Sequence, residues 1–392
     1  MRAVVWHGKE DVRVDNVADP GLREPTDAIV RITSTAICGS DLHLYSKLWP
    51  LMRRGDIIGH EPMGIVEETG SAVEHIQSGD RVVVPFNISC GQCYLCERDL
   101  YSQCETTRDR GRLAQKVNLL GRGRGASLFG YTHVYGAVPG GQAEYLRVPQ
   151  AHFGPVKVPE EAEGVPDERF VYLSDVLPTA WQAVAYADVP AGGTVAVWGL
   201  GPVGQMCARI AYHQGAGRVI GVDPVAERLS MAARYGVETV DPLGVDNAAA
   251  VVLGMTGGRG VDSAIDAVGM EASGSKLDSV LQASKVQLDK TKALWQCATA
   301  VSRGGTLSIS GIYAGPVQMF PLGDLFDMQV QIRMGQANVR RWVPEILPLL
   351  GEDDPLGTED LTTHTLALED APRAYDMFQN KRDGAIKAVL KP

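Results

Sequence analysis

TVAVWGLGPVG, which spans residues 194–204, is the segment that says most about the fold of this chain. An apolar run leads directly into glycines spaced Gly-x-Gly-x-x-Gly, and a helix-forming segment at 205–214 follows. Such glycines allow a tight turn, and they let the backbone approach a pyrophosphate at the N-terminus of the helix. The stretch therefore predicts a dinucleotide-binding unit. A glycine-rich turn in an unrelated α/β protein is the alternative.

An acidic residue follows at the distance that such a unit requires. The strand pattern RVIGVD ends at Asp223, 19 residues after the last glycine and close to the roughly 20 that are expected. A carboxylate there accepts hydrogen bonds from the adenosine ribose and repels a 2′-phosphate. Pro224 follows it, not an arginine, and Arg228 lies too far along the chain to decide the preference. The pattern predicts NAD and not NADP, with these candidate contacts: Gly199, Gly201, Pro202, Val203, Gly204, Asp223 and Arg228.

Four cysteines lie close together in CGQCYLCERDLYSQC, at residues 90–104. They are Cys90, Cys93, Cys96 and Cys104. Zinc–sulfur bonds of ~2.3 Å need ligands gathered this tightly, and a closed shell of four thiolates leaves no position for substrate. We therefore expect a structural zinc in this lobe. A disulfide pair is the alternative, which the sparse use of cysteine elsewhere in the chain disfavours.

A second pair of candidate ligands precedes the lobe, in CGSDLH at 38–43 and GHE at 59–61. Cys38 and His60 are a soft and a borderline ligand at a separation that suits a site built from the ends of two strands. Alone, such a cysteine is usually a small buried hydrophobe, and such a histidine a hydrogen-bonded residue. Their joint occurrence just before a four-cysteine lobe favours metal binding.

These motifs, in this order, resemble those of the zinc-containing medium-chain alcohol dehydrogenases. The resemblance includes GDRV at 79–82 and covers essentially the whole chain. Within that family the chain is most similar to the branch of glutathione-independent formaldehyde dehydrogenase, on GGQAEY (140–145), HFGPVKVP (152–159) and SDVLPTAW (174–181). The resemblance implies an oxidoreductase that interconverts an alcohol and an aldehyde or ketone by hydride transfer to and from NAD.

The resemblance also implies a third ligand for a catalytic zinc. Many family members place a cysteine at the position of Asp175, and the polyol dehydrogenases place a glutamate there. No cysteine lies between Cys104 and Cys207. A shell of Cys38, His60 and Asp175 is harder than one with two thiolates, and it should leave zinc a stronger Lewis acid. A helix N-cap before Val176 is the alternative role for Asp175.

Further roles follow from the same resemblance. Ser40 is expected to hydrogen-bond the substrate oxygen and to pass its proton through the nicotinamide ribose to His43. Glu61 either enters the zinc shell during ligand exchange or orients a ligand. Asp41 is expected to fix His60 or its loop and not to act as an acid catalyst.

Two residues are expected to contact the coenzyme. Thr179 should lie near the nicotinamide ring. Lys387 matches a position where family members often place a cation on the coenzyme, with a solvated lysine at a strand edge as the equal alternative. The family further implies two zinc ions per chain and a homodimer or homotetramer.

The expected fold is α/β, with a GroES-like antiparallel β catalytic domain and a Rossmann doubly wound parallel sheet. We place the catalytic domain at 1–175 and 337–392 and the NAD-binding domain at 176–336. Candidate strands lie at 2–6, 28–35, 64–68, 81–85, 195–198, 219–223, 263–267, 306–310 and 330–334. Two further segments are expected to be a mobile surface loop, at 105–141, and a long polar helix, at 274–301.

Composition fits a two-domain enzyme that acts on small molecules. The 392 residues exceed what one core usually organises. The 37 basic and 47 acidic residues give a net charge of −10, which argues against nucleic acid or an anionic membrane as a partner. The start of the chain lacks a basic and apolar leader, and seven cysteines, most of them assigned to zinc, fit a reducing compartment. We therefore expect a cytoplasmic protein.

Three other functions remain open at this point. The first is a zinc-free quinone or enoyl reductase, which the ligand set disfavours. The second is a glutathione-independent formaldehyde dehydrogenase or dismutase that holds NAD tightly. The third is a catalytically silent NAD-binding sensor or structural protein, which the Ser40–His43 pair disfavours.

Overall fold

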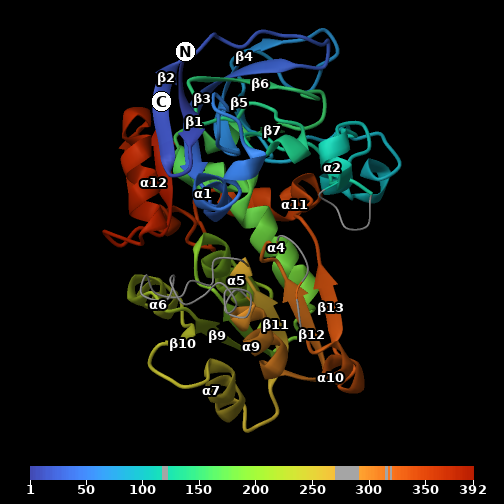
Figure 1. Ribbon diagram of the computed structural model, residues 1–392, viewed down its shortest axis with the longest axis vertical. Coiled ribbons are helices and arrows are strands. Elements are labelled where there is room, and N and C mark those ends of the chain that lie inside the picture. Colours follow the sequence, from blue (N-terminus) through green and yellow to red (C-terminus); the bar gives the residue numbers. More distant parts are fainter. Residues whose placement is uncertain (117–121, 270–290, 314–316, 318–319) are drawn as a thin grey trace. The chain divides into compact units, whose positions relative to one another are not determined.

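The computed structural model describes residues 1–116, 122–269, 291–313, 317 and 320–392 (Figure 1). These residues form two compact units, one of Met1–Pro178 with Ala337–Pro392 and one of Thr179–Gln336. Within the described ranges, no helix has both the length and the apolar character that a membrane crossing requires.

The first unit is built on an antiparallel sheet of seven strands and a two-stranded ribbon. The order in the larger sheet is β14-β15-β3-β4-β5-β7, and β6 also pairs with β3. Only β14 and β15 run parallel. The strands are β1 Arg2–Gly8, β2 Asp11–Asn16, β3 Ala28–Ile37, β4 Glu61–Thr69, β5 Arg81–Val83, β6 Tyr145–Val148, β7 Val156–Lys157, β14 His364–Ala367 and β15 Ala388–Lys391.

Strand β3 is the central strand of this sheet, and its pairing positions the candidate site. Ala36 of β3 lies opposite Glu61 of β4, because the two strands are antiparallel. Ala388 of β15 lies opposite Ile37 at the same end of β3. The end of β3, the start of β4 and the C-terminal strand therefore meet at one edge of the sheet.

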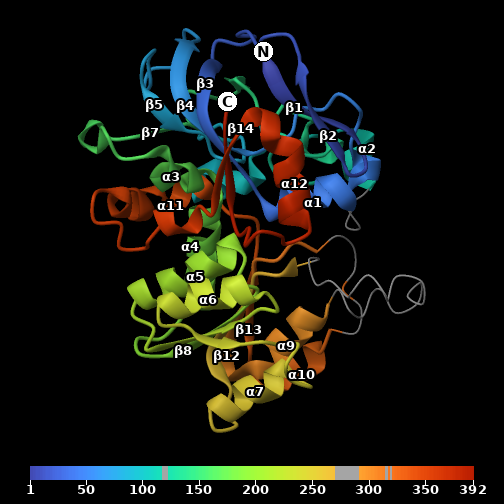
Figure 2. The same cartoon turned by 90° about the vertical axis from the view of Figure 1, so that its left-hand side faces the viewer.

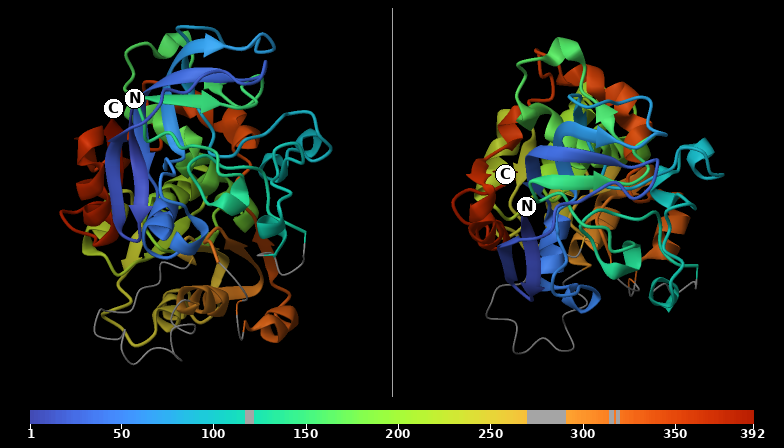
Figure 3. Two further views of the ribbon diagram at one scale, coloured as in Figure 1. Left: turned by 45° about the horizontal axis from the view of Figure 1, so that its top comes forward. Right: turned by 90° about the horizontal axis from the view of Figure 1, so that it is seen from above.

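Short helices surround the strands of the first unit. The α-helices are α1 Gly39–Ser46, α2 Arg112–Lys116, α3 Asp167–Phe170, α11 Val339–Ile346 and α12 Ala371–Gln379. The 3-10 helices are η1 Trp49–Leu51, η2 Cys96–Arg98, η3 Tyr101–Gln103, η4 His133–Tyr135, η5 Glu160–Ala162, η6 Val171–Ser174, η8 Leu347–Leu350, η9 Glu359–Leu361 and η10 Leu368–Asp370. Figure 3 shows α12 beside the β1–β2 ribbon, with which it shares an apolar core.

The second unit is a six-stranded parallel sheet in the order β10-β9-β8-β11-β12-β13. Its strands are β8 Thr194–Trp198, β9 Arg218–Val222, β10 Glu238–Val240, β11 Val261–Asp266, β12 Val301–Ile309 and β13 Gln331–Met334. Its helices are α4 Val176–Ala187, which begins just before this unit, α5 Pro202–His213, α6 Ala226–Arg234, α7 Ala248–Met255, α9 Lys292–Ala300 and α10 Leu322–Asp327. Helices α5 and α6 cover one face of the sheet, and α7 and α9 cover the other (Figure 2).

The strand order confirms the predicted fold class. From β8 the chain winds outward through β9 to β10, and it then returns to the other side of β8 at β11. This reversal is the switch point of a doubly wound sheet, where ligands bind outside the carboxyl ends of the strands. All nine predicted strands are present. In this sheet β10 was not predicted, because its three residues carry too little pattern. The short strands β2, β6, β7, β14 and β15 of the first unit were not predicted either.

Two sequence-based expectations about insertions need correction or stay untested. The stretch expected to be a mobile surface loop is partly core, because Leu128 and Phe129 are 5% and 1% exposed. Phe129 packs with strands β3 and β4, and Leu128 bridges to Asn87. Of the long helix expected at 274–301, α9 occupies the last part, and 270–290 lies outside the described residues.

Candidate active site

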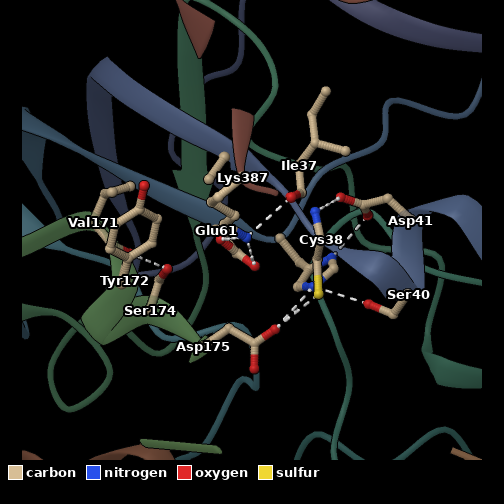
Figure 4. Close-up of polar contacts among 12 residues, drawn as sticks. Ile37, Cys38, Ser40, Asp41, Glu61, Val171, Tyr172, Ser174, Asp175 and Lys387 are labelled. Carbon is tan, nitrogen blue, oxygen red and sulfur yellow. Dashed lines mark hydrogen bonds and ion pairs between the residues drawn. The ribbon is translucent and has the colours of Figure 1, made fainter. Parts of the chain in front are cut away.

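Cys38, His60 and Asp175 come together where strand β3 ends and strand β4 begins. Figure 4 shows Cys38 and Asp175 pointing toward one another there. Cys38 follows the last residue of β3, and His60 precedes the first residue of β4. Antiparallel pairing of these strands brings the two side chains together across the intervening segment. Asp175 enters from the junction between η6 and α4. The structure thus joins the three residues that the sequence predicts as ligands.

The donor atoms of these residues have the spacing of a metal shell. Asp175 Oδ2 lies 3.4 Å from Cys38 Sγ and 3.3 Å from His60 Nε2. Ligand atoms around a tetrahedral zinc are about 3.3 to 3.8 Å apart, given bonds of about 2.0 to 2.3 Å. Together with one Glu61 carboxylate oxygen, the donor atoms of these three residues all lie within 4.8 Å of one another. The residues present therefore fit a zinc ion.

Electrostatics in this cluster also favour a cation. Burial, and then the nearby Asp175 and Glu61 carboxylates, raise the pKa of Cys38 to about 11. Burial lowers the pKa of His60, but the Asp41 carboxylate and the hydrogen bonds with Asp175, Asp41 and Cys38 outweigh it and raise this pKa well above its ordinary value. A divalent cation among these groups would compensate the crowded negative charge.

Asp41 fixes both the histidine and its loop, as the sequence predicts. Its Oδ1 lies 2.9 Å from His60 Nδ1. Its Oδ2 accepts the backbone N–H of Cys38 at 3.0 Å, which caps helix α1. A neutral His60 would keep its proton on Nδ1, which faces the Asp41 carboxylate, and would present Nε2 to a metal in the cluster.

Ser40 lies at the same cluster. Its Oγ is 3.2 Å from His60 Nε2. His43 follows on the same helix α1 and is buried, with 4% of its surface exposed. The two residues occupy neighbouring turns of one helix, which is compatible with the predicted relay. The relay itself stays a prediction.

Lys387 is not the solvated strand-edge lysine that was one of its two expected roles. Its side chain is fully buried, and its Nζ lies 2.7 Å and 2.6 Å from the two Glu61 carboxylate oxygens. The same ammonium donates to Ile37 O at 3.0 Å (Figure 4). Burial lowers the pKa of Lys387, but the Glu61 charge outweighs it and raises the pKa. The predicted coenzyme contact of Lys387 stays a prediction.

The four cysteines of the lobe form a second compact cluster. Their sulfur atoms all lie within 4.8 Å of one another, and Cys93 Sγ is 4.0 Å from Cys104 Sγ. All seven cysteines are free thiols, so the structure does not support the disulfide alternative. Burial raises the pKa of Cys93, but backbone hydrogen bonds from Glu105 and Cys96 outweigh it and lower this pKa to about 6. The donor set fits a closed zinc site.

The glycine motif of the second unit forms a tight turn between β8 and α5. Gly199 has a φ of +85°, and a Cβ on Gly204 would lie 1.8 Å from Gly199 O. Gly201 is the N-cap of α5, so Pro202, Val203 and Gly204 form its first turn. These positions agree with the phosphate-binding role predicted for the motif, which no contact here tests.

Asp223 lies at the end of β9, beside this turn. Its Oδ2 accepts the N–H of Leu200 at 2.7 Å, and Arg228 Nη1 lies 3.5 Å from the same oxygen. Asp223 and Arg228 therefore flank the glycine turn, as their predicted coenzyme roles require. Thr179 lies in the first turns of α4, and its predicted contact with nicotinamide stays a prediction.

Two aromatic residues at the cluster were not predicted. The rings of Phe86 and Tyr131 lie 6.2 Å and 6.4 Å from the His60 ring, with their planes steeply inclined to it. Phe86 directly follows the strand predicted at 81–85, which is the one sequence signal that could have found it. Tyr131 carries no such signal, since it lies in the stretch expected to be a surface loop.

Comparisons with known proteins agree with this geometry. The family model of the alcohol dehydrogenase GroES-like domain matches residues 24–160, and that of zinc-binding dehydrogenases matches residues 202–288. An uncharacterised zinc-type alcohol dehydrogenase-like protein of Bacillus subtilis is 42% identical over 395 residues, which cover all of both chains. The solved structure of an alcohol dehydrogenase from Thermus superposes with a TM-score of 0.82 at 34% identity, over 100% of this chain and 99% of that one.

Relatives named for formaldehyde are also similar over the full length. The formaldehyde dismutase of Pseudomonas putida is 30% identical over 413 residues, which cover 100% of this chain and 97% of that protein. The glutathione-independent formaldehyde dehydrogenase of Bacillus subtilis is 30% identical over 423 residues, with the same coverage.

Proposed function

The chain belongs to the zinc-type alcohol dehydrogenase family, and we propose that it interconverts an alcohol with an aldehyde or ketone, with NAD as the hydride carrier. Membership of this family makes it an oxidoreductase. We assign metal and substrate binding to the unit Met1–Pro178 with Ala337–Pro392, and coenzyme binding to the unit Thr179–Gln336. We also propose a homodimer or homotetramer.

The convergence of Cys38, His60 and Asp175 carries this proposal. These residues would hold the catalytic zinc, and the four cysteines of the lobe would hold a structural one. When bound, the catalytic zinc supplies Lewis acidity that lowers the pKa of an alcohol oxygen. A carboxylate oxygen donates less charge to the zinc than a thiolate sulfur does. Asp175 in place of a second thiolate therefore favours a stronger Lewis acid.

The chain's own residues then move the substrate proton. The Ser40 hydroxyl lies 3.2 Å from His60 Nε2, so it can accept the proton of an alcohol that binds beside the cluster. His43, one turn further along the same helix, is the group to which we assign its onward transfer, because an imidazole can both accept and donate a proton. Phe86 and Tyr131 offer apolar surface that excludes water beside the cluster.

The glycine turn and Asp223 support NAD as the coenzyme. The first turn of α5 presents backbone N–H groups to a pyrophosphate, and the Asp223 carboxylate disfavours a 2′-phosphate. The Asp223 carboxylate lies close to Arg228 and offsets part of the positive charge of that arginine. Arg228 is therefore a weaker partner for the 2′-phosphate of NADP.

Formaldehyde chemistry is a second candidate for the substrate. The full-length similarity to a formaldehyde dismutase and a formaldehyde dehydrogenase favours it. A dismutase would oxidise one aldehyde and reduce another with the same bound coenzyme, so it would turn over without added NAD.

Two assays on the purified protein separate these candidates. The purified protein is incubated with NAD and a panel of primary alcohols, secondary alcohols, polyols and formaldehyde, and NADH is followed by its absorbance. We expect NAD-dependent NADH formation with at least one alcohol, and its loss in Cys38→Ser. Formate and methanol formed from formaldehyde without added NAD would instead support the dismutase. A wild-type protein that is inactive in both assays would contradict the proposed function.

A further inference from the structure

A buried polar chain leads from the C-terminal helix α12 to His60. Tyr375 of α12 donates its hydroxyl to Gln142 Oε1 at 2.8 Å. Gln142 Nε2 lies 3.4 Å from Asp41 Oδ2, and Asp41 Oδ1 lies 2.9 Å from His60 Nδ1. Tyr375, Gln142 and Asp41 are each 0% exposed. The chain joins segments that are far apart in sequence, since Tyr375 and Gln142 are 233 positions apart.

The orientation of the Gln142 amide is determined by its surroundings. Its Nε2 faces two acceptors, Ala36 O at 3.3 Å and the Asp41 carboxylate at 3.4 Å. A flipped amide would point its oxygen at both and would leave the buried hydroxyl of Tyr375 facing an N–H donor. The Gln142 side chain also packs directly on the backbone of Gly59, the residue before His60. A Cβ on Gly59 would lie only 2.2 Å from Gln142 Cγ.

We propose that Tyr375 and Gln142 are positioning residues for the catalytic zinc, which act through Asp41 on the orientation and tautomer of His60. A buried carboxylate is costly unless its oxygens are hydrogen-bonded. Asp41 receives hydrogen bonds from Cys38 N–H and from Gln142, and the oxygen directed at His60 is thereby held in place. Loss of the Tyr375 hydroxyl frees the Gln142 amide to turn, and Asp41 can then turn away from Nδ1.

This inference rests on the proposed zinc site. It predicts that variants of Tyr375 and Gln142 lose the catalytic zinc faster than the wild type does. Partners one step removed from a ligand typically change metal affinity 10- to 100-fold, so a residue further back should change it less. We expect Tyr375→Phe to release the catalytic zinc roughly three- to tenfold faster to a chelator. Gln142→Leu should have at least the same effect, and release of the lobe zinc should be unchanged in both.

Tyr172→Phe is the matched control. Tyr172 is also 0% exposed, and its hydroxyl likewise bonds one side chain, that of Thr362. Its removal costs one buried hydroxyl hydrogen bond beside the proposed ligand Asp175, and it keeps both the backbone hydrogen bond from Asp175 N–H to Tyr172 O and the chain from Tyr375 to His60. If Tyr172→Phe accelerates zinc release as much as Tyr375→Phe does, a general loss of packing explains the effect and the inference is wrong.

The experiment measures zinc release from purified holoprotein with a chromogenic chelator, in wild type, Tyr375→Phe, Asp41→Asn and the double variant. If Tyr375 acts through Asp41, Tyr375→Phe adds nothing to the rate in the Asp41→Asn background, because coupled positions are not additive. Release of both zinc ions from Tyr375→Phe at wild-type rates would overturn the inference alone. A wild-type protein that carries only the lobe zinc would overturn the proposed function as well, so the two failures are distinguishable.

Discussion

Asp175 Oδ2 lies 3.3 Å from His60 Nε2, although 115 positions separate the two residues in the sequence. Both side chains are polar and nearly inaccessible to solvent, and burial of such groups is costly unless they are paired or bind a metal. Together with Cys38, they form the donor set on which the proposed chemistry depends.

The four-cysteine lobe should hold zinc that supports folding and not catalysis. We expect the purified protein to carry two zinc ions per chain and Cys93→Ser to carry one. Because a structural zinc contributes directly to the free energy of folding, Cys93→Ser should unfold at a lower temperature and retain measurable turnover while it stays folded. Zinc content by elemental analysis and thermal unfolding check this. A wild-type protein that is stable and active with one zinc per chain would remove the lobe assignment.

Asp223 should determine the choice between NAD and NADP. Asp223→Ser removes a charge that repels a 2′-phosphate and a ribose acceptor, so the ratio of kcat/KM for NAD over NADP should fall by at least tenfold, a shift of about 1.4 kcal/mol. Steady-state kinetics with each coenzyme measures it. The result would count against our interpretation if the wild type already preferred NADP.

The buried pair of Lys387 and Glu61 should matter far more for stability than the partly exposed pair of Lys391 and Glu168. Lys387→Met leaves the Glu61 carboxylate buried without its partner, and we expect a loss of about 3 to 5 kcal/mol in the free energy of unfolding. Lys391→Met is the control. Lys391 pairs with Glu168 but is 36% exposed, so this change should cost at most about 1 kcal/mol. Urea unfolding compares the two, and equal losses would contradict the burial argument.

Asp167 should contribute stability that depends on pH. Burial raises the pKa of Asp167, but hydrogen bonds from Thr33, Ser34 and Arg81 outweigh it and lower this pKa below its ordinary value. A depressed pKa in the folded state gives stability that is present above the unfolded pKa of about 3.9 and is lost as pH falls through the folded pKa.

Asp167→Asn should therefore be less stable than wild type by about 1.5 to 3 kcal/mol at pH 7, and the difference should shrink as pH falls below about 4. Comparing the two proteins at each pH cancels the loss of metal that both suffer in acid. A difference that stays constant down to pH 3 would show that the Asp167 charge is not involved.

Local patterns made much of this structure predictable. The glycine turn and the cysteine lobe are each encoded within about a dozen residues, so their geometry follows from short-range spacing. The pairing of Cys38 with His60 was predictable because each lies at the end of a strand and the two strands pair. Asp41 was predictable as a partner of His60 from its place within the ligand motif.

Other features depend on contacts that no local pattern encodes. The burial of Lys387 against Glu61 results from the pairing of β15 with β3, which brings the C-terminal strand beside the end of β3 that leads into Cys38. The link from Tyr375 through Gln142 is of the same kind. The many glycines and arginines at 105–141 led us to predict a surface loop there. Phe129 within this stretch is a core residue, and composition gave no indication of its burial.

Asp175 distinguishes this site from a metal shell with two thiolates, and the proposed chemistry depends on it. The Asp175 side chain could cap helix α4 only in part. An N-cap side chain accepts the N–H of the second or third helical residue, and Pro178 at the third position has no N–H. If Asp175 is a ligand, Asp175→Cys should retain metal with altered rates, whereas a cap lost in Asp175→Ala should cost only ~1 kcal/mol of stability. Asp376→Ala, which removes an exposed carboxylate paired with Arg382, is the control for charge loss.

The most direct test is the zinc content of purified Asp175→Ala, measured by elemental analysis beside wild type and Asp376→Ala. We expect two zinc ions per chain in wild type and in Asp376→Ala. We expect one in Asp175→Ala, with nearly all turnover lost and NAD binding retained. Two zinc ions per chain in an Asp175→Ala protein that remains active would contradict the site formed by Cys38, His60 and Asp175.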